Sequence, residues 1–226
     1  MEINSKKLQP LPSPEDLIAS LPLSPSGYKS VTQHRKNVEA ILHNDDDRFL
    51  LIIGPCSIHN TDEAYEYFRR LQVLTTEVSD VFFIVMRTYF EKSRTSLGWP
   101  GFIADPNLTG DYDITEGLKQ ARKYLLTTIE EGMPVAAEFV DPLVAPYLSD
   151  LITWGAIGAR NVSSSKHRTL ASCLPMPIGF KNTVEGSLSS PINAVITSRL
   201  PQPHISVDKK GHIALFLSQG NPHSHI

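Results

Sequence analysis

The sequence predicts an α/β fold around a parallel sheet, and three observations support this. From residue 49 onward, short apolar runs alternate with segments of helical periodicity. The first run is continuously apolar, as expected for a strand that is buried on both faces. Charged residues follow the runs, at the strand ends where barrel enzymes carry their functional side chains. Together these features imply either a (β/α)₈ barrel or an open doubly wound sheet.

The N-terminal part of the chain lacks this alternation. Residues 1 to about 26 are rich in Pro, Ser and Leu and predict an extended arm. Residues 28–42 carry apolar positions at helical spacing and predict a surface helix, and residues 43–48 form a polar break. We therefore divide the chain into an N-terminal arm and helix, residues 1–48, and an α/β domain, residues 49–226.

The α/β domain contains about five βα units. We predict strands at residues 49–55, 81–89, 134–140, 157–160 and 177–181. We predict helices at residues 61–79, 113–131, 144–154 and 166–173, and a further helix that opens near residue 190. Thr61 to Glu63 start the first of these helices, Asp113 caps the second, and Gly132 ends it. Residues 204–207 and 212–218 alternate in polarity around a turn and predict an inserted β-hairpin at residues 204–217.

Composition excludes several classes of protein. The net charge is −3 with both signs interspersed, so we expect neither nucleic acid nor a membrane as partner. Two cysteines in 226 residues are too few for a disulfide framework, and the apolar runs are too short to span a bilayer. No G-x-G-x-x-G or G-x-x-x-x-G-K-[ST] motif follows a predicted strand, which weakens the nucleotide-binding alternative. We expect a soluble, cytoplasmic protein.

The predicted strand ends carry a set of residues that indicates an anionic substrate. Four of the six are cationic, and cations at one mouth repel each other unless an anion lies between them. A phosphorylated or carboxylated substrate is therefore implied. The six residues are Cys56, Arg87, Lys92, Glu138, Arg160 and Lys181.

Two of these residues allow more than one interpretation. Cys56 suits a small core position, a ligand for a divalent metal, or a nucleophile. Lys181 suits an anion-binding charge or a Schiff-base former like that of lysine-dependent aldolases. The other cysteine, Cys173, lies in an apolar segment and is expected in the core.

Six segments resemble the class I 3-deoxy-D-arabino-heptulosonate-7-phosphate (DAHP) synthases, which are microbial enzymes regulated by aromatic amino acids. The segments lie in the family's order along the chain from about residue 7 onward. They are IIGPCSIH, VMRTYFEKSRTSLGWPGFIADP, EFVDP, WGAIGAR, HRTLASCLPMPIGFKN and QGNPHSHI. The resemblance implies a (β/α)₈ TIM barrel, here incomplete, with an N-terminal helical arm and an inserted hairpin.

The resemblance also implies an activity, the first step of the shikimate pathway. These enzymes condense phosphoenolpyruvate with erythrose 4-phosphate to give DAHP and phosphate, and they need a divalent metal ion such as Mn, Fe, Co or Zn. Cys56 matches the family's cysteine metal ligand. The substrate-binding positions are Arg87, Lys92, Arg94, Thr95, Glu138, Arg160 and Lys181, and of these Lys92 and Lys181 are assigned to catalysis.

The sequence departs from the family pattern in several places. It ends where the family's sixth strand starts, so we expect the remaining metal ligands to be absent from this chain. Ser93 replaces the proline of K-P-R-T, and residues 161–165 and 183–185 also differ from the family. The arm and the hairpin match family elements that make subunit contacts. We therefore expect either a homo-oligomer or a mixed oligomer with a full-length paralogue. A catalytically impaired paralogue and a Schiff-base aldolase using Lys181 are the alternatives.

Overall fold

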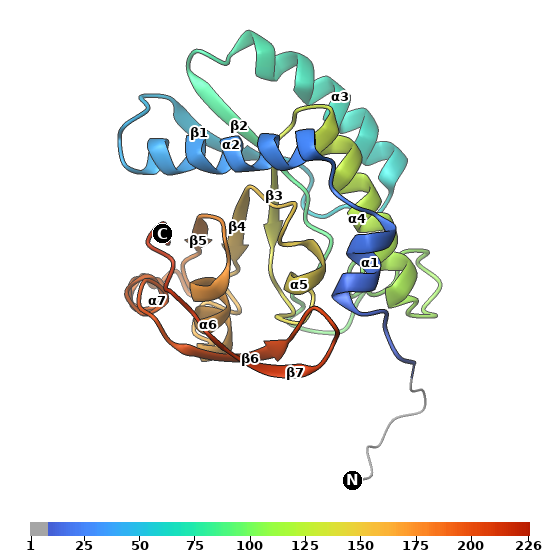
Figure 1. The fold of residues 1–226 in the computed structure, drawn as a ribbon. Coiled ribbons are helices and arrows are strands. Elements are labelled where there is room, and N and C mark those ends of the chain that lie inside the picture. Colours follow the sequence, from blue (N-terminus) through green and yellow to red (C-terminus); the bar gives the residue numbers. More distant parts are fainter. Residues whose placement is uncertain (1–8) are drawn as a thin grey trace.

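A parallel sheet of five strands, in the order β1-β2-β3-β4-β5, lies at the centre of the computed structural model, which describes residues 9–226 (Figure 1). All four neighbouring pairs run parallel, from Phe49 opposite Phe82 to Ile157 opposite Phe180. The predicted α/β fold with a parallel sheet is confirmed. The strands are β1 (Phe49–Ile53), β2 (Phe82–Arg87), β3 (Val135–Glu138), β4 (Trp154–Ile157) and β5 (Ile178–Phe180).

Helices connect each strand to the next in this sheet. In α4, the side chain of Asp113 accepts the backbone N–H of Glu116, and Gly132 follows the helix with a φ of +87°. Both end signals predicted for this helix are therefore confirmed. No helix among residues 9–226 is both long and apolar enough to cross a membrane. The connecting helices are α3 (Thr61–Glu77), α4 (Ile114–Glu130), α5 (Ala145–Leu148) and α6 (Ser165–Cys173), and α7 (Ser189–Ser198) follows β5.

Alternate residues of the strands supply two apolar clusters, one on each face of the sheet. Ile84 and Met86 of β2 pack into the larger cluster together with α3 and α4. Phe83 and Val85 of β2 pack into the smaller cluster, which also contains Val38. The sheet therefore has apolar packing on both faces, and its charged residues are left to the strand ends.

The predicted hairpin is confirmed as β6 (Pro203–Val207) paired antiparallel with β7 (Ile213–Leu217). Its turn is stabilised by Asp208, whose side chain accepts the N–H groups of Lys210 and His212. The hairpin packs along α6 and lies away from β1 and β2 in Figure 1. Near the end of the chain, His225 forms a parallel bridge with Gly179, on the free edge of β5.

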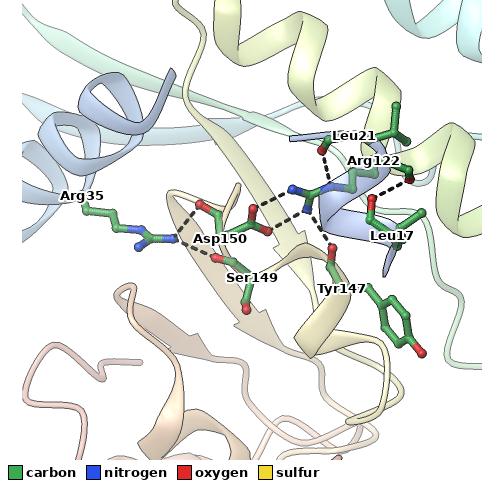
Figure 2. Close-up of polar contacts among 8 residues, drawn as sticks. Leu17, Leu21, Arg35, Arg122, Tyr147, Ser149 and Asp150 are labelled. Atoms are coloured by element: carbon green, nitrogen blue, oxygen red, sulfur yellow. Dashed lines mark hydrogen bonds and ion pairs between the residues drawn. The ribbon is translucent and has the colours of Figure 1, made fainter. Parts of the chain in front are cut away.

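The N-terminal helices α1 (Pro14–Ser20) and α2 (Pro25–Leu42) are fastened to the helical layer by a buried arginine. Arg122 of α4 is fully buried, and Figure 2 shows its guanidinium between Leu21, Tyr147 and Asp150. Its Nη atoms lie 2.8 and 2.7 Å from the Asp150 carboxylate, and its Nε donates to the Leu21 carbonyl. Arg35 of α2 donates to the carbonyl of Ser149 at 2.8 Å (Figure 2). One network therefore joins α1, α2, α4 and the turn after α5.

Three predicted elements differ from those observed. The extended arm is wrong for residues 14–20, which form α1 behind a Ser13 cap, and residues 1–8 lie outside the described part. The fourth strand lies at residues 154–157 rather than 157–160. The helix predicted at residues 144–154 is reduced to α5, and the next residues form turns.

Two local predictions also need correction. Asn60, rather than Thr61, caps α3, because its side chain accepts the N–H groups of Asp62 and Glu63. β1 is not buried on both faces as predicted: it is an edge strand, and Phe49 is 67% exposed. An apolar run shows that a strand can be buried. Whether it is buried depends on what packs against it, and an edge strand lacks a neighbouring strand on one side.

Candidate functional site

The carboxyl ends of all five strands contribute to one cavity of about 430 Å³. Arg87 and Glu138 end β2 and β3, and Lys181 directly follows β5. Cys56 and Arg160 each lie three residues beyond a strand, after β1 and β4. Every site residue predicted from the sequence lines this cavity: Cys56, Arg87, Lys92, Arg94, Thr95, Glu138, Arg160 and Lys181.

The Cys56 thiol is exposed and paired with a lysine. Lys92 Nζ lies 3.1 Å from Cys56 Sγ, and Arg87 donates to the Cys56 carbonyl oxygen at 3.0 Å. The hydrogen bond from Lys92 lowers the pKa of the Cys56 thiol, and the charges of Lys92 and Arg87 act in the same direction. The thiolate form of Cys56 is therefore favoured by its neighbours, and Cys56 is not the small core residue that its type often is.

Arg87 lies over an aromatic ring. Its guanidinium lies 4.0 Å from the centre of the Tyr89 ring, and Lys181 Nζ lies 5.3 Å from the same ring. Such stacking orients the guanidinium without neutralising its charge. Arg87 Nε is buried and has no hydrogen-bond partner among the described residues. An unsatisfied buried donor beside a cavity is suited to an oxyanion from a ligand.

Glu138 and Lys181 form an ion pair within the cavity. Lys181 Nζ lies 3.3 Å from Glu138 Oε2, and the Glu138 side chain is only 12% exposed. Gly158, just beyond β4, leaves the space for this carboxylate, because a Cβ at residue 158 would overlap Glu138 Oε1. The small residue after β4 thereby allows the strand-end glutamate to turn towards Lys181.

The segment 92–100 forms a loop over the cavity. Arg94 Nε donates to the Trp99 carbonyl at 2.8 Å, which folds the loop onto itself. Arg160 Nε donates to Thr95 Oγ1 at 2.6 Å and so connects the loop to the end of β4. Ser93 also lines the cavity.

Two residues of this region were not predicted from the sequence. Tyr89 is buried, and its ring contacts Arg87 and Lys181. Glu91 lines the cavity and accepts two backbone N–H groups. Both lie in the segment TYFE between Arg87 and Lys92, so their position next to two predicted residues was the available signal. Burial raises the pKa of Glu91 to about 8, and hydrogen bonds from the N–H groups of Asp141 and Val140 offset only part of that rise.

The described residues do not complete a metal site around Cys56. Within residues 9–226, no three His, Cys, Asp or Glu side chains gather closely enough to hold an ion. Cys173, the second cysteine, is only partly buried, and burial raises its pKa. A thiolate at the cavity fits one position around a divalent ion, and the other positions must be supplied by groups outside this set.

Comparison with known proteins identifies the family. Residues 28–223 match the profile described as "DAHP synthetase I family". The chain belongs to this family. The resemblance found in the sequence is thereby confirmed.

Curated relatives and a solved structure match along nearly the whole chain. The Tyr-sensitive phospho-2-dehydro-3-deoxyheptonate aldolase of Salmonella typhimurium is 45% identical over 96% of this chain, and the Trp-sensitive enzyme of Escherichia coli is 43% identical over 100%. The structure of a phospho-2-dehydro-3-deoxyheptonate aldolase from Francisella tularensis has 42% identity and a TM-score of 0.96 over 98% of this chain. The chain spans 61% of the Salmonella relative and 65% of the other two.

Proposed function

We propose that the protein condenses phosphoenolpyruvate with erythrose 4-phosphate to give DAHP and inorganic phosphate, the first step of the shikimate pathway. The observation that carries this proposal is the convergence of Arg87, Arg160 and Lys181 from separate strand ends on one cavity, with Lys92 beside them. Lys181 is paired with Glu138 and Lys92 with Cys56, but Arg87 and Arg160 have no ion-pair partner among the described residues. Neutral substrates would leave these two guanidinium charges uncompensated, whereas both proposed substrates are anions at neutral pH.

Phosphoenolpyruvate fits the inner part of the cavity. Arg87 and Arg160 offer planar guanidinium groups for a carboxylate or a phosphate, and Lys181 adds a point charge. The buried Nε of Arg87, which lacks a partner among the described residues, gains an acceptor when such an anion binds. We place the phosphate of erythrose 4-phosphate at Arg94 and Thr95, on the loop that covers the cavity.

The reaction needs proton transfers, which we assign to the two lysines of the cavity. A carbon–carbon bond forms between C3 of phosphoenolpyruvate and the aldehyde carbon, and the aldehyde oxygen takes up a proton. Positive character develops at C2, water adds there and loses a proton, and the bond from C2 to the phosphate oxygen breaks. Lys181 and Lys92 are the proposed proton donors, and the cationic groups offset the repulsion between the two substrates.

The proposal also includes a partial barrel and a bound metal ion. We infer that residues 49–226 form part of a (β/α)₈ barrel and that residues 1–48 are its N-terminal arm. Cys56 would supply a thiolate ligand to a divalent ion.

Release of inorganic phosphate tests this function. The protein is incubated with phosphoenolpyruvate, erythrose 4-phosphate and Mn²⁺, and phosphate and DAHP are measured in equal amounts. Phosphate release should require both substrates and be lost in Lys181→Met. If borohydride instead traps a covalent substrate adduct on Lys181, the protein is a Schiff-base aldolase and the proposal is wrong.

A further inference from the structure

Glu91 connects two of the loops that surround the cavity. Its Oε1 accepts the N–H of Asp141 at 2.9 Å, and its Oε2 accepts the N–H of Val140 at 3.2 Å. Both N–H groups belong to the segment that follows β3, whereas Glu91 follows β2. One carboxyl group thereby satisfies two backbone donors that no strand pairing satisfies.

Glu91 also lies at the neck of the loop that carries Lys92, Arg94 and Thr95. Glu91 and Gly101 form an antiparallel bridge, and Lys92 N–H donates to the Pro100 carbonyl at 3.2 Å. A Cβ at Gly101 would lie 2.7 Å from the Phe90 carbonyl oxygen, so the close approach of the two loop ends needs a glycine. The loop therefore leaves the body of the protein at one narrow point, and the Glu91 side chain fixes that point to β3.

The far side of the same peptide segment is held as well. His167 Nε2 donates to the Val140 carbonyl at 2.9 Å, and Ser164 Oγ lies 3.0 Å from His167 Nδ1. Val140 thus has its N–H bound to Glu91 and its carbonyl bound to α6. β3 ends at Glu138, two residues before Val140, and Glu138 is the ion-pair partner of Lys181. The hydrogen bonds of Glu91 therefore hold the loop close to the strand end that carries Glu138.

We propose that Glu91 is a positioning residue, whose carboxyl group holds the loop 92–100 against the end of β3 so that Lys92, Arg94 and Thr95 face the cavity. The consequence for substrate binding rests on the proposed function, but the effect on the loop does not. A loop of this length that is released at its neck regains conformational freedom, and its cationic groups no longer meet an anion in one geometry. Glu91 makes no contact with substrate in this role.

Hydrogen exchange of the full chain tests the effect on the loop. In Glu91→Ala, amides of residues 90–101 should exchange at least about tenfold faster, while amides of β3 and β4 keep their protection. Glu91→Gln keeps one carbonyl acceptor and should fall between Glu91→Ala and the wild type. Glu131→Gln makes the same chemical change at an exposed residue outside the cavity and should exchange like the wild type.

Titration with phosphoenolpyruvate tests the consequence for binding. Glu91→Ala should raise the Kd at least about tenfold, and Glu131→Gln should leave it unchanged. Unchanged exchange in residues 90–101 of Glu91→Ala, or equal acceleration across all strands, would overturn the positioning role. If the wild type binds no phosphoenolpyruvate but the loop still exchanges faster in Glu91→Ala, the proposed function fails and the positioning role stands.

Discussion

Lys92 Nζ lies 3.1 Å from Cys56 Sγ, so the ammonium of one predicted site residue stabilises the thiolate of another. The two residues come from different strand ends, after β2 and after β1. Their contact lowers the pKa of Cys56 without any metal ion, because the lysine supplies both a hydrogen bond and a positive charge. The lowered pKa of the Cys56 thiol should therefore appear as a faster reaction with alkylating reagents.

Alkylation rates test this pairing. At pH 7, Cys56 should react with iodoacetamide faster than Cys173, whose pKa is raised by burial. Lys92→Met should slow the alkylation of Cys56 several-fold and leave Cys173 unchanged, as measured by mass spectrometry of the two peptides. Equal rates for Cys56 in the wild type and in Lys92→Met would show that the lysine does not influence the thiol.

Replacement of Arg122 tests the attachment of the N-terminal helices. Arg122→Met leaves the Asp150 carboxylate and the carbonyls of Leu21 and Tyr147 without their donor, because Arg122 bonds all three. Breaking a buried pair on one side costs about 3–5 kcal/mol of the free energy of unfolding. Because the Asp150 side chain is 34% exposed, we expect a loss near the lower end of this range. Arg70→Met removes an exposed pair with Glu66 and should cost only about 0.5 kcal/mol. Urea unfolding measures both, and similar losses in the two variants would contradict the structural role of Arg122.

The raised pKa of Glu91 should make the stability of the protein depend on pH. Its folded-state pKa of about 8 exceeds its ordinary value of 4.5, so between these two values the folded protein binds more protons than the unfolded chain. The contribution of neutral Glu91 to stability is therefore complete below pH 4.5 and is lost as the pH rises through 8. The free energy of unfolding should fall across this window more steeply in the wild type than in Glu91→Gln. Parallel profiles would show that Glu91 keeps its ordinary pKa.

Substitution of Gly158 tests the room left for the buried carboxylate. A methyl group in Gly158→Ala would occupy the position of Glu138 Oε1, so Glu138 has to turn away from Lys181. We expect phosphoenolpyruvate to bind about tenfold more weakly, with the protein still folded. The control is Gly186→Ala, at a glycine outside the cavity where a Cβ meets nothing within 4 Å. Its φ of +85° means that the alanine lowers stability through backbone strain, but binding should match the wild type. Binding by Gly158→Ala as tight as in the wild type would mean that the position of Glu138 is not required.

The positions of the site residues could be predicted because they follow from topology. In parallel βα units the carboxyl ends of the strands meet at one edge, so a residue after each apolar run is enough to place Arg87, Glu138 and Lys181 together. The role of Glu91 could not be predicted in this way. It depends on which backbone N–H groups come within reach after folding, and the sequence contains no pattern for such a contact.

The differences between the predicted and the observed elements have local physical causes. Ser13 and Pro14 provide a helix cap and a first-turn proline for α1, but the surrounding Pro and Ser residues suggested an arm. Gly155 lies inside β4, where a Cβ would meet the side chains of Ile178 and Phe139. Glycine is unfavourable inside strands in general, so a strand that needs one for close packing is hard to locate from sequence.

Calorimetric titration of the full chain with phosphoenolpyruvate tests the central claim most directly, since that claim is the binding of a phosphorylated anion by the converging cations. The wild type should bind one equivalent, with an affinity that weakens as salt is added. Arg160→Gln should weaken binding at least about tenfold, and Arg69→Gln, at an exposed position of α3 outside the cavity, should not. Absence of saturable binding, or equal affinity in Arg160→Gln and the wild type, would contradict the account.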